Sequence, residues 1–214
     1  MVEVAYDEMK KRIIGHELAP GAQILEEELA LMLGMSRTPV REAAVRLEQE
    51  GFVELVPRRG VKVTPLSKRA VREINEVLEC LEIQAAERLA ARHVSAEELR
   101  RLDLAVTEMD VALESEDIQA WAEADYKFHK LLIELCGNAH LTAVAQNFLD
   151  KAHRFRLLTL TLRAKPVYSN VNHAAVLEAV RRNDPQTAQD IHRAHKRRWA
   201  RELTELLDRL DLPE

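Results

Sequence analysis

The sequence predicts a mainly α-helical protein: three helices and a β-hairpin come first, and an antiparallel bundle of six or seven helices follows. Three observations support this prediction. Leu, Ala, Glu and Arg dominate the composition, and these residues lose little side-chain freedom in a helix. Only six Gly and seven Pro occur in 214 residues, too few for a turn-rich β protein. Alternating apolar and polar residues are confined to the first third of the chain, and helical periodicity dominates afterwards.

The first third contains three predicted helices. Residues 6–14 place their apolar side chains on one helical face. Residues 26–33 form a short helix with Met32 among its inward-pointing residues, and Gly34 ends it as a left-handed cap. A serine cap starts the third helix, which covers residues 36–50 and has its apolar side chains on one face.

A β-hairpin is predicted directly after the third helix. Residues 52–56 and 61–63 alternate as strands do, and the basic turn 57–60 joins them. Gly60 supplies the permissive backbone that such a turn needs. Two short helices, a third helix and a hairpin are together the layout of a winged helix-turn-helix, whose third helix enters the major groove of DNA.

Basic and polar side chains gather at the two places where this layout contacts DNA. Arg37 and Arg41 are four residues apart and share a helical face, and Thr38 lies beside them. Arginine can bind guanine at two atoms or hold a phosphate. Arg58 and Arg59 at the hairpin tip suit the minor groove or the backbone. The net charge of −5 does not oppose this, because DNA binding needs only one basic face.

The same region resembles the N-terminal domain of the GntR family of transcription factors. Three segments carry the resemblance, which extends over about residues 6–64: Leu18-Ala-Pro-Gly21, Leu33-Gly-Met-Ser-Arg-Thr-Pro-Val-Arg-Glu-Ala43 and Arg46-Leu-Glu-Gln-Glu-Gly51. It implies that Arg37, Thr38, Arg41 and the wing around Gly60 contact DNA. One departure is the acidic stretch 26–28, where some members of the family carry a DNA-contacting arginine.

The rest of the chain reads as a helical domain. Its predicted helices cover residues 68–92, 95–114, 117–136, 139–162, 168–182 and 185–210. The Pro-Leu-Ser sequence at 65–67 marks the boundary. We therefore expect a DNA-binding domain over 1–64, a linker and the start of the first bundle helix over 65–72, and a helical domain over 73–214.

Histidines give this helical domain a candidate metal site. Asp125 and His129 are four residues apart and share a helical face, while His173 and His195 lie on the two last predicted helices. Three imidazoles and a carboxylate suit a divalent ion such as Zn, Ni or Mn. The residues alone leave a second interpretation open, in which the bundle only mediates dimerisation and the histidines are packed or surface residues.

A second resemblance favours the metal site. Residues about 70–210 resemble the FCD effector-binding domain of the FadR-type branch of the same family. The motif Asp125-Tyr-Lys-Phe-His129, the following Leu-Cys-Gly-Asn138 and the later segments 172–180 and 188–195 carry it. The resemblance implies that Asp125, His129, His173 and His195 hold a divalent metal ion, which helps to bind a small carboxylate effector.

The expected effector pocket departs from the family at one position. Leu78 stands where the first bundle helix usually carries a pocket arginine. The effector is then either less acidic or held by Arg154 or Arg156, two alternatives that the sequence leaves open. His192, one turn before His195, is a reserve candidate for this pocket.

We therefore expect a cytoplasmic homodimer that binds a palindromic operator as a repressor and responds to an organic acid. No apolar run is long enough to span a membrane, and the first residues lack the apolar core of a signal peptide. Two other functions remain at this stage. One is a DNA-binding protein whose dimer domain is stabilised by metal without effector control. The other is a metal-dependent hydrolase or lyase, against which we find no separate general base.

Overall fold

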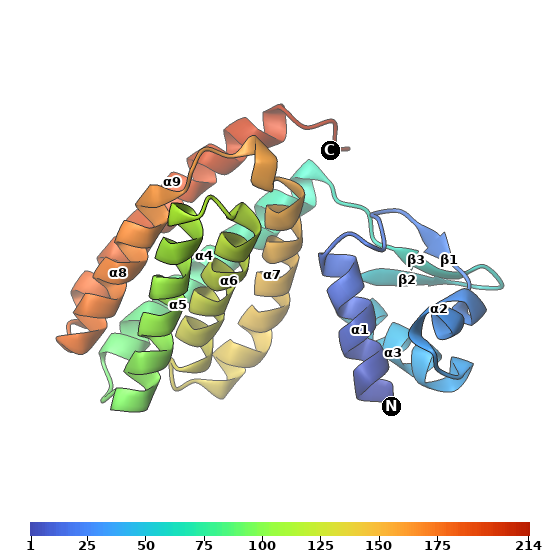
Figure 1. Ribbon diagram of the computed structural model, residues 1–214, viewed down its shortest axis with the longest axis horizontal. Coiled ribbons are helices and arrows are strands. Elements are labelled where there is room, and N and C mark those ends of the chain that lie inside the picture. The colour runs from blue at the N-terminus through green and yellow to red at the C-terminus, as the bar shows by residue number, and fades with distance from the viewer. The chain divides into compact units, whose positions relative to one another are not determined.

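A computed structural model describes residues 1–214 and divides them into two compact units, Met1–Ser67 and Lys68–Glu214 (Figure 1). The first unit holds three helices and a small sheet, and the second holds six α-helices. The predicted mainly helical fold is confirmed. No helix combines the length and the apolar composition that crossing a bilayer requires.

The first unit contains all the predicted elements and one more. Its helices are α1 (Val2–Ile14), α2 (Glu26–Leu33) and α3 (Arg37–Gln49), and its strands are β1 (Gln23–Ile24), β2 (Val53–Val56) and β3 (Gly60–Val63). The strands form one antiparallel sheet in the order β1-β3-β2. Strand β1 was not predicted, because two residues are too short to show an alternating pattern.

The core of the first unit lies between α1, α3 and the sheet. Met9, Ile13, Leu47 and Phe52 are completely buried there. The prediction that Met32 points inward is wrong, since its side chain is 49% exposed. Helix α2 has only eight residues, and it reaches the core with Leu29 and Ala30 instead.

The turn of the wing requires glycine at its last position. Gly60 has a φ of 81°, and a Cβ atom there would lie 2.2 Å from the carbonyl oxygen of Ile24. Strand β1 therefore packs so closely on this turn that no other side chain fits. Arg58, earlier in the same turn, also has a positive φ of 63°.

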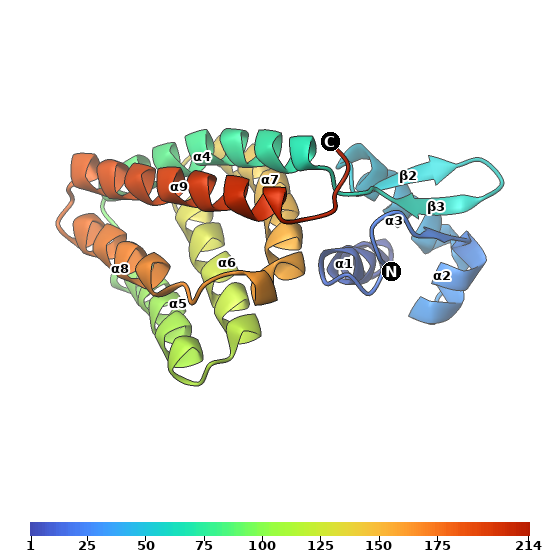
Figure 2. The ribbon, with the colours of Figure 1, turned by 90° about the horizontal axis from the view of Figure 1, so that it is seen from above.

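The second unit is a bundle of six α-helices, seen from two directions in Figures 1 and 2. They are α4 (Lys68–Ala90), α5 (Ala96–Glu114), α6 (Ile118–Glu134), α7 (Ala139–Leu158), α8 (Val167–Arg181) and α9 (Pro185–Asp208). The number is six rather than seven. A single 3₁₀ turn, Leu160–Leu162, follows α7, so this helix ends four residues before the predicted boundary.

Polar caps fix the helix ends that the sequence predicted. The Ser95 hydroxyl accepts a hydrogen bond from the Glu98 amide, and the Glu98 carboxylate accepts one from the Ser95 amide. The Asn138 side chain accepts hydrogen bonds from the His140 and Leu141 amides at the start of α7, and Asp184 caps α9, where Pro185 occupies the first turn. These caps satisfy backbone amides at the starts of α5, α7 and α9 and so fix where each helix begins.

The interior of the bundle is not uniformly apolar. Trp121 and Phe128 on α6 are each 1% exposed and fill the centre of the apolar core. Buried ionisable side chains lie in the same interior: Glu82, Asp125, His129, His173, His192, His195 and Lys196. Burying such groups costs free energy unless they are paired or hold a ligand, so their arrangement points to a site.

Candidate metal centre and nucleic-acid interface

The start of α3 presents the polar residues that were expected to contact DNA. Arg37, Thr38 and Arg41 are exposed, while Pro39 and Val40 between them are buried. The buried pair anchors the first turn of the helix on the core. The three polar side chains are consequently displayed on the solvent side of α3, as a recognition helix requires.

Arg37 and Arg41 differ in their environment. The Arg37 guanidinium lies 2.8 Å from Glu27 and 3.7 Å from Glu26, both on α2. Arg41 forms no ion pair. The acidic stretch at the start of α2 therefore occupies Arg37 in the free protein, whereas Arg41 is ready to meet a phosphate or a base.

Not every arginine of α3 faces outward. Arg46 pairs with Glu3 at 2.6 Å and stacks on the ring of Tyr6 at 4.0 Å, so it fastens α3 to α1. At the wing, Arg58 and Arg59 are exposed on the turn that Gly60 closes. The wing tip and the start of α3 are thus the two sites where the arginines expected to contact DNA are exposed.

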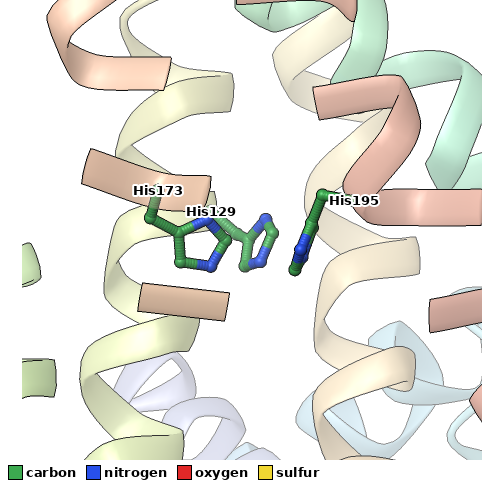
Figure 3. A group of neighbouring side chains, drawn as sticks. All are labelled: His129, His173 and His195. Carbon is green, nitrogen blue, oxygen red and sulfur yellow. The ribbon is translucent and has the colours of Figure 1, made fainter. Parts of the chain in front are cut away.

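In the second unit, three histidines from three helices meet (Figure 3). His129 comes from α6, His173 from α8 and His195 from α9, and their possible ligand nitrogens all lie within 4.8 Å of one another. The side chains are almost completely buried. Because α8 and α9 follow α6 only after another helix and a loop, sequence spacing alone does not show this meeting.

Asp125 joins the three histidines. One of its carboxylate oxygens lies 3.0 Å from Nε2 of His173, and the other lies 3.6 Å from Nε2 of His129 and 2.7 Å from the Arg156 guanidinium. Burial alone would raise the pKa of Asp125, but the charges of Arg156 and His129 hold it well below its usual range. The carboxylate is therefore anionic.

The donor set fits a divalent metal ion. Burial lowers the pKa of His173 to about 4 and also holds the pKa of His195 well below its usual range. At neutral pH both imidazoles are neutral, which is the form that binds metal. The Nδ1 atoms of both rings are buried without a hydrogen-bond partner in the chain. Three imidazoles and one carboxylate would suit Zn or a similar transition metal.

A second group of possible ligands shares His129. Glu82 lies 3.0 Å from Nδ1 of His129 and 3.0 Å from Nε2 of His192. The ammonium group of Lys196 lies 2.9 Å from the same carboxylate oxygen of Glu82. Both carboxylates therefore have a cationic partner, but the group around Asp125 offers three imidazoles and the group around Glu82 only two, so the first is the better metal site.

The sequence prediction did not include Glu82 as a functional residue. It lies four residues after Leu78 on the buried face of α4, and it is completely buried. A lone glutamate at a core position of an amphipathic helix is the signal that identifies it. Its contact with His129 suggests that it orients this ring, as carboxylates behind metal-bound histidines do.

Comparisons with known proteins identify the family. Residues 1–63 match the model of the bacterial regulatory proteins of the gntR family, and residues 73–198 match the FCD domain. The chain belongs to the GntR family. An HTH-type transcriptional regulator of Bacillus subtilis, YdhC, is 31% identical over 89% of this chain and 85% of its own length.

Other members and a solved structure agree with this. The gluconate operon transcriptional repressor of Bacillus subtilis is 29% identical over 86% of this chain and 76% of its own length. The fold is similar to that of Escherichia coli McbR/YncC, with a TM-score of 0.80, 22% identity and coverage of 95% of this chain and 97% of that one. The chain is a DNA-binding transcriptional regulator with an FCD domain.

A cavity of about 270 Å³ opens beside the histidines of the FCD domain. Its inner end is formed by Asp125, His129, His195 and Arg156. Three aromatic side chains form part of its wall: Trp121, Tyr168 and Trp199. Its cationic lining residues are Arg156, Arg163, Lys165, Lys196, Arg198 and Arg209, and its acidic ones are Asp125, Glu202 and Glu205. The excess of cations favours an anionic ligand.

The four expected pocket residues have different places. Arg156 lines the cavity, but Arg154 does not, because a separation of two residues turns a side chain about 200° around a helix. Leu78 is 1% exposed and belongs to the apolar core. His192 contacts Glu82 rather than the cavity. Of the two alternative arginines, Arg156 is the one in position to hold an effector.

Proposed function

We propose that this GntR-family regulator is a homodimeric repressor that binds a palindromic operator and is controlled by a carboxylate effector at a metal site in its FCD domain. The observation that carries this proposal is the meeting of Asp125, His129, His173 and His195, of which Asp125, His129 and His195 line a cationic cavity. We assign operator contacts to Arg37, Thr38, Arg41, Arg58 and Arg59, with Gly60 shaping the wing.

The chemistry of the cavity supports a carboxylate. A divalent ion held by Asp125 and the three histidines would offer an open position to a carboxylate oxygen. Arg156, whose guanidinium lies at 2.7 Å from Asp125, adds a donor beside it. Trp121 and Trp199 form apolar parts of the cavity wall, which suit the carbon skeleton of a small organic acid.

The positions of the proposed ligands in the chain support control by an effector. The proposed ligands lie on α6, α8 and α9, so metal and effector would fix three helices relative to one another. An effector changes DNA binding when it favours one dimer geometry and the operator favours another. We propose that effector binding releases the operator.

The first experiment measures metal and effector binding together. Purified protein is expected to hold about one divalent ion per chain, and a chelator should lower the melting temperature because the ion stabilises only the folded state. Small carboxylates should then raise the melting temperature only when metal is present. Stabilisation by metal with no response to any acid would favour a metal-stabilised regulator without effector control. Absence of bound metal would refute the proposed site.

Replacing Arg41 by alanine is expected to weaken operator binding. A duplex selected by the protein from a random library serves as operator, and binding is measured at several salt concentrations. Loss of one phosphate contact should reduce the slope of log K against log salt by about one, and loss of a base contact costs about 1–3 kcal/mol. Arg100→Ala on α5 removes the same charge from an exposed site and should change neither quantity. If the Arg41→Ala variant binds the operator as tightly as the unmodified protein, α3 does not contact DNA as proposed.

A further inference from the structure

One arginine of the FCD cavity has a role that the metal site does not explain. Arg163 follows the 3₁₀ turn Leu160–Leu162 and lines the same cavity as Asp125, His129 and Arg156. Its guanidinium forms no ion pair, and its Nη1 atom is buried without a hydrogen-bond partner in the chain. The side chains of Lys165 and Arg209 are exposed to solvent, whereas this nitrogen is buried.

Two aromatic rings hold the guanidinium of Arg163 in place. It lies 4.2 Å from the ring centre of Trp199 and 5.8 Å from that of Trp121. The two indoles are themselves fixed, since Trp199 donates a hydrogen bond to Asn75 and Trp121 donates one to Asn170. The guanidinium is therefore positioned before any ligand arrives, which lowers the entropic cost of binding.

The other cations of the inner cavity already have anionic partners. Arg156 lies against Asp125, Lys196 against Glu82 and Arg198 against Glu202. For Arg163, burial and then the nearby charge of Arg156 lower the pKa to about 10. It stays charged at neutral pH although burial disfavours the charge. A bound anion would offset the free-energy cost of burying this charge. The planar guanidinium of arginine can also donate two parallel hydrogen bonds to one carboxylate.

We infer that Arg163 forms a second anion subsite and that the effector is a small dicarboxylate, with one carboxylate at the metal and Arg156 and the other at Arg163. This inference rests on the proposed effector function and names the class of ligand. The two subsites open into one cavity of about 270 Å³, which suits a small molecule rather than a long-chain acid.

The test compares dicarboxylates with acids that lack only the second charge. Succinate and glutarate are titrated calorimetrically into the metal-loaded full-length protein, and so are their monoamides, succinamate and glutaramate. At least one dicarboxylate should bind roughly tenfold to a hundredfold more tightly than its monoamide, as expected for hydrogen bonds to a charged group. In Arg163→Gln this preference should vanish, while the affinities for the monoamide and the metal stay the same.

A matched variant separates the subsite from general charge. Lys165→Gln removes a positive charge from the same loop and the same cavity, and it should keep the preference for the dicarboxylate. Equal loss of the preference in both variants would overturn the inference, and so would an Arg163→Gln variant that keeps it. A purely structural Arg163 would lower the stability without changing the ratio of the two affinities. Binding of both acids with equal affinity by the unmodified protein refutes the dicarboxylate but keeps the carboxylate effector, whereas binding of neither refutes both.

Discussion

Replacing His173 by alanine is expected to abolish tight metal binding, whereas the same replacement of His192 should weaken metal binding much less. Both histidines are completely buried, and they belong to the two different groups of possible ligands that share His129. His173 would be a direct ligand beside Asp125. The Nε2 atom of His192 lies 3.0 Å from Glu82, which in turn contacts His129. Loss of an outer partner of this kind costs about 10–100-fold in metal affinity, and loss of a ligand should cost more.

The measurement is competition with a coloured chelator, using variants whose circular dichroism shows an intact fold. The exposed His140 at the start of α7 serves as a second control, because His140→Ala should not change the metal affinity. A larger loss for His192→Ala than for His173→Ala would place the ion with Glu82 instead. Equal and small losses would mean that neither group holds the metal.

The helices of the FCD domain could be predicted from the sequence because their signals are local. Apolar residues recur at helical spacing, and Ser95, Asn138 and Asp184 cap the helices they precede. Strand β1 could not be predicted, since its two residues depend on pairing with β3. Likewise, no local pattern shows that the segment after α7 brings the Arg163 guanidinium close to two indole rings.

The metal site was predicted for a different reason. The spacing of Asp125 and His129 puts both on one face of α6, but only the resemblance to FCD domains connected them with His173 and His195. The structure brings these four residues together. It also shows what the resemblance did not include: the buried pair of Glu82 and Lys196, whose members are 114 residues apart and come from α4 and α9.

This buried pair leads to the largest expected effect on stability. Glu82 is completely buried, Lys196 is 4% exposed, and their charged atoms lie 2.9 Å apart. Burial alone would raise the pKa of Glu82, but His129 and Lys196 hold it well below its usual range, so the carboxylate is charged. Removing one partner of a buried ion pair leaves the other charge without compensation and costs about 3–5 kcal/mol. Glu82→Ala should lower the free energy of unfolding of the FCD domain by this amount.

Urea unfolding with a chelator present measures this effect without a contribution from metal binding. Both tryptophans, Trp121 and Trp199, lie in the helical unit Lys68–Glu214, so their fluorescence reports the unfolding of this unit alone. Glu76→Ala removes an exposed glutamate from the same helix and should cost less than about 0.5 kcal/mol. In Glu82→Ala combined with Lys196→Met both charges are gone, and part of the lost stability should return. If Glu82→Ala unfolds at the same urea concentration as Glu76→Ala, the Glu82–Lys196 pair does not stabilise the bundle. The remaining role of Glu82 would then be to orient the ring of His129.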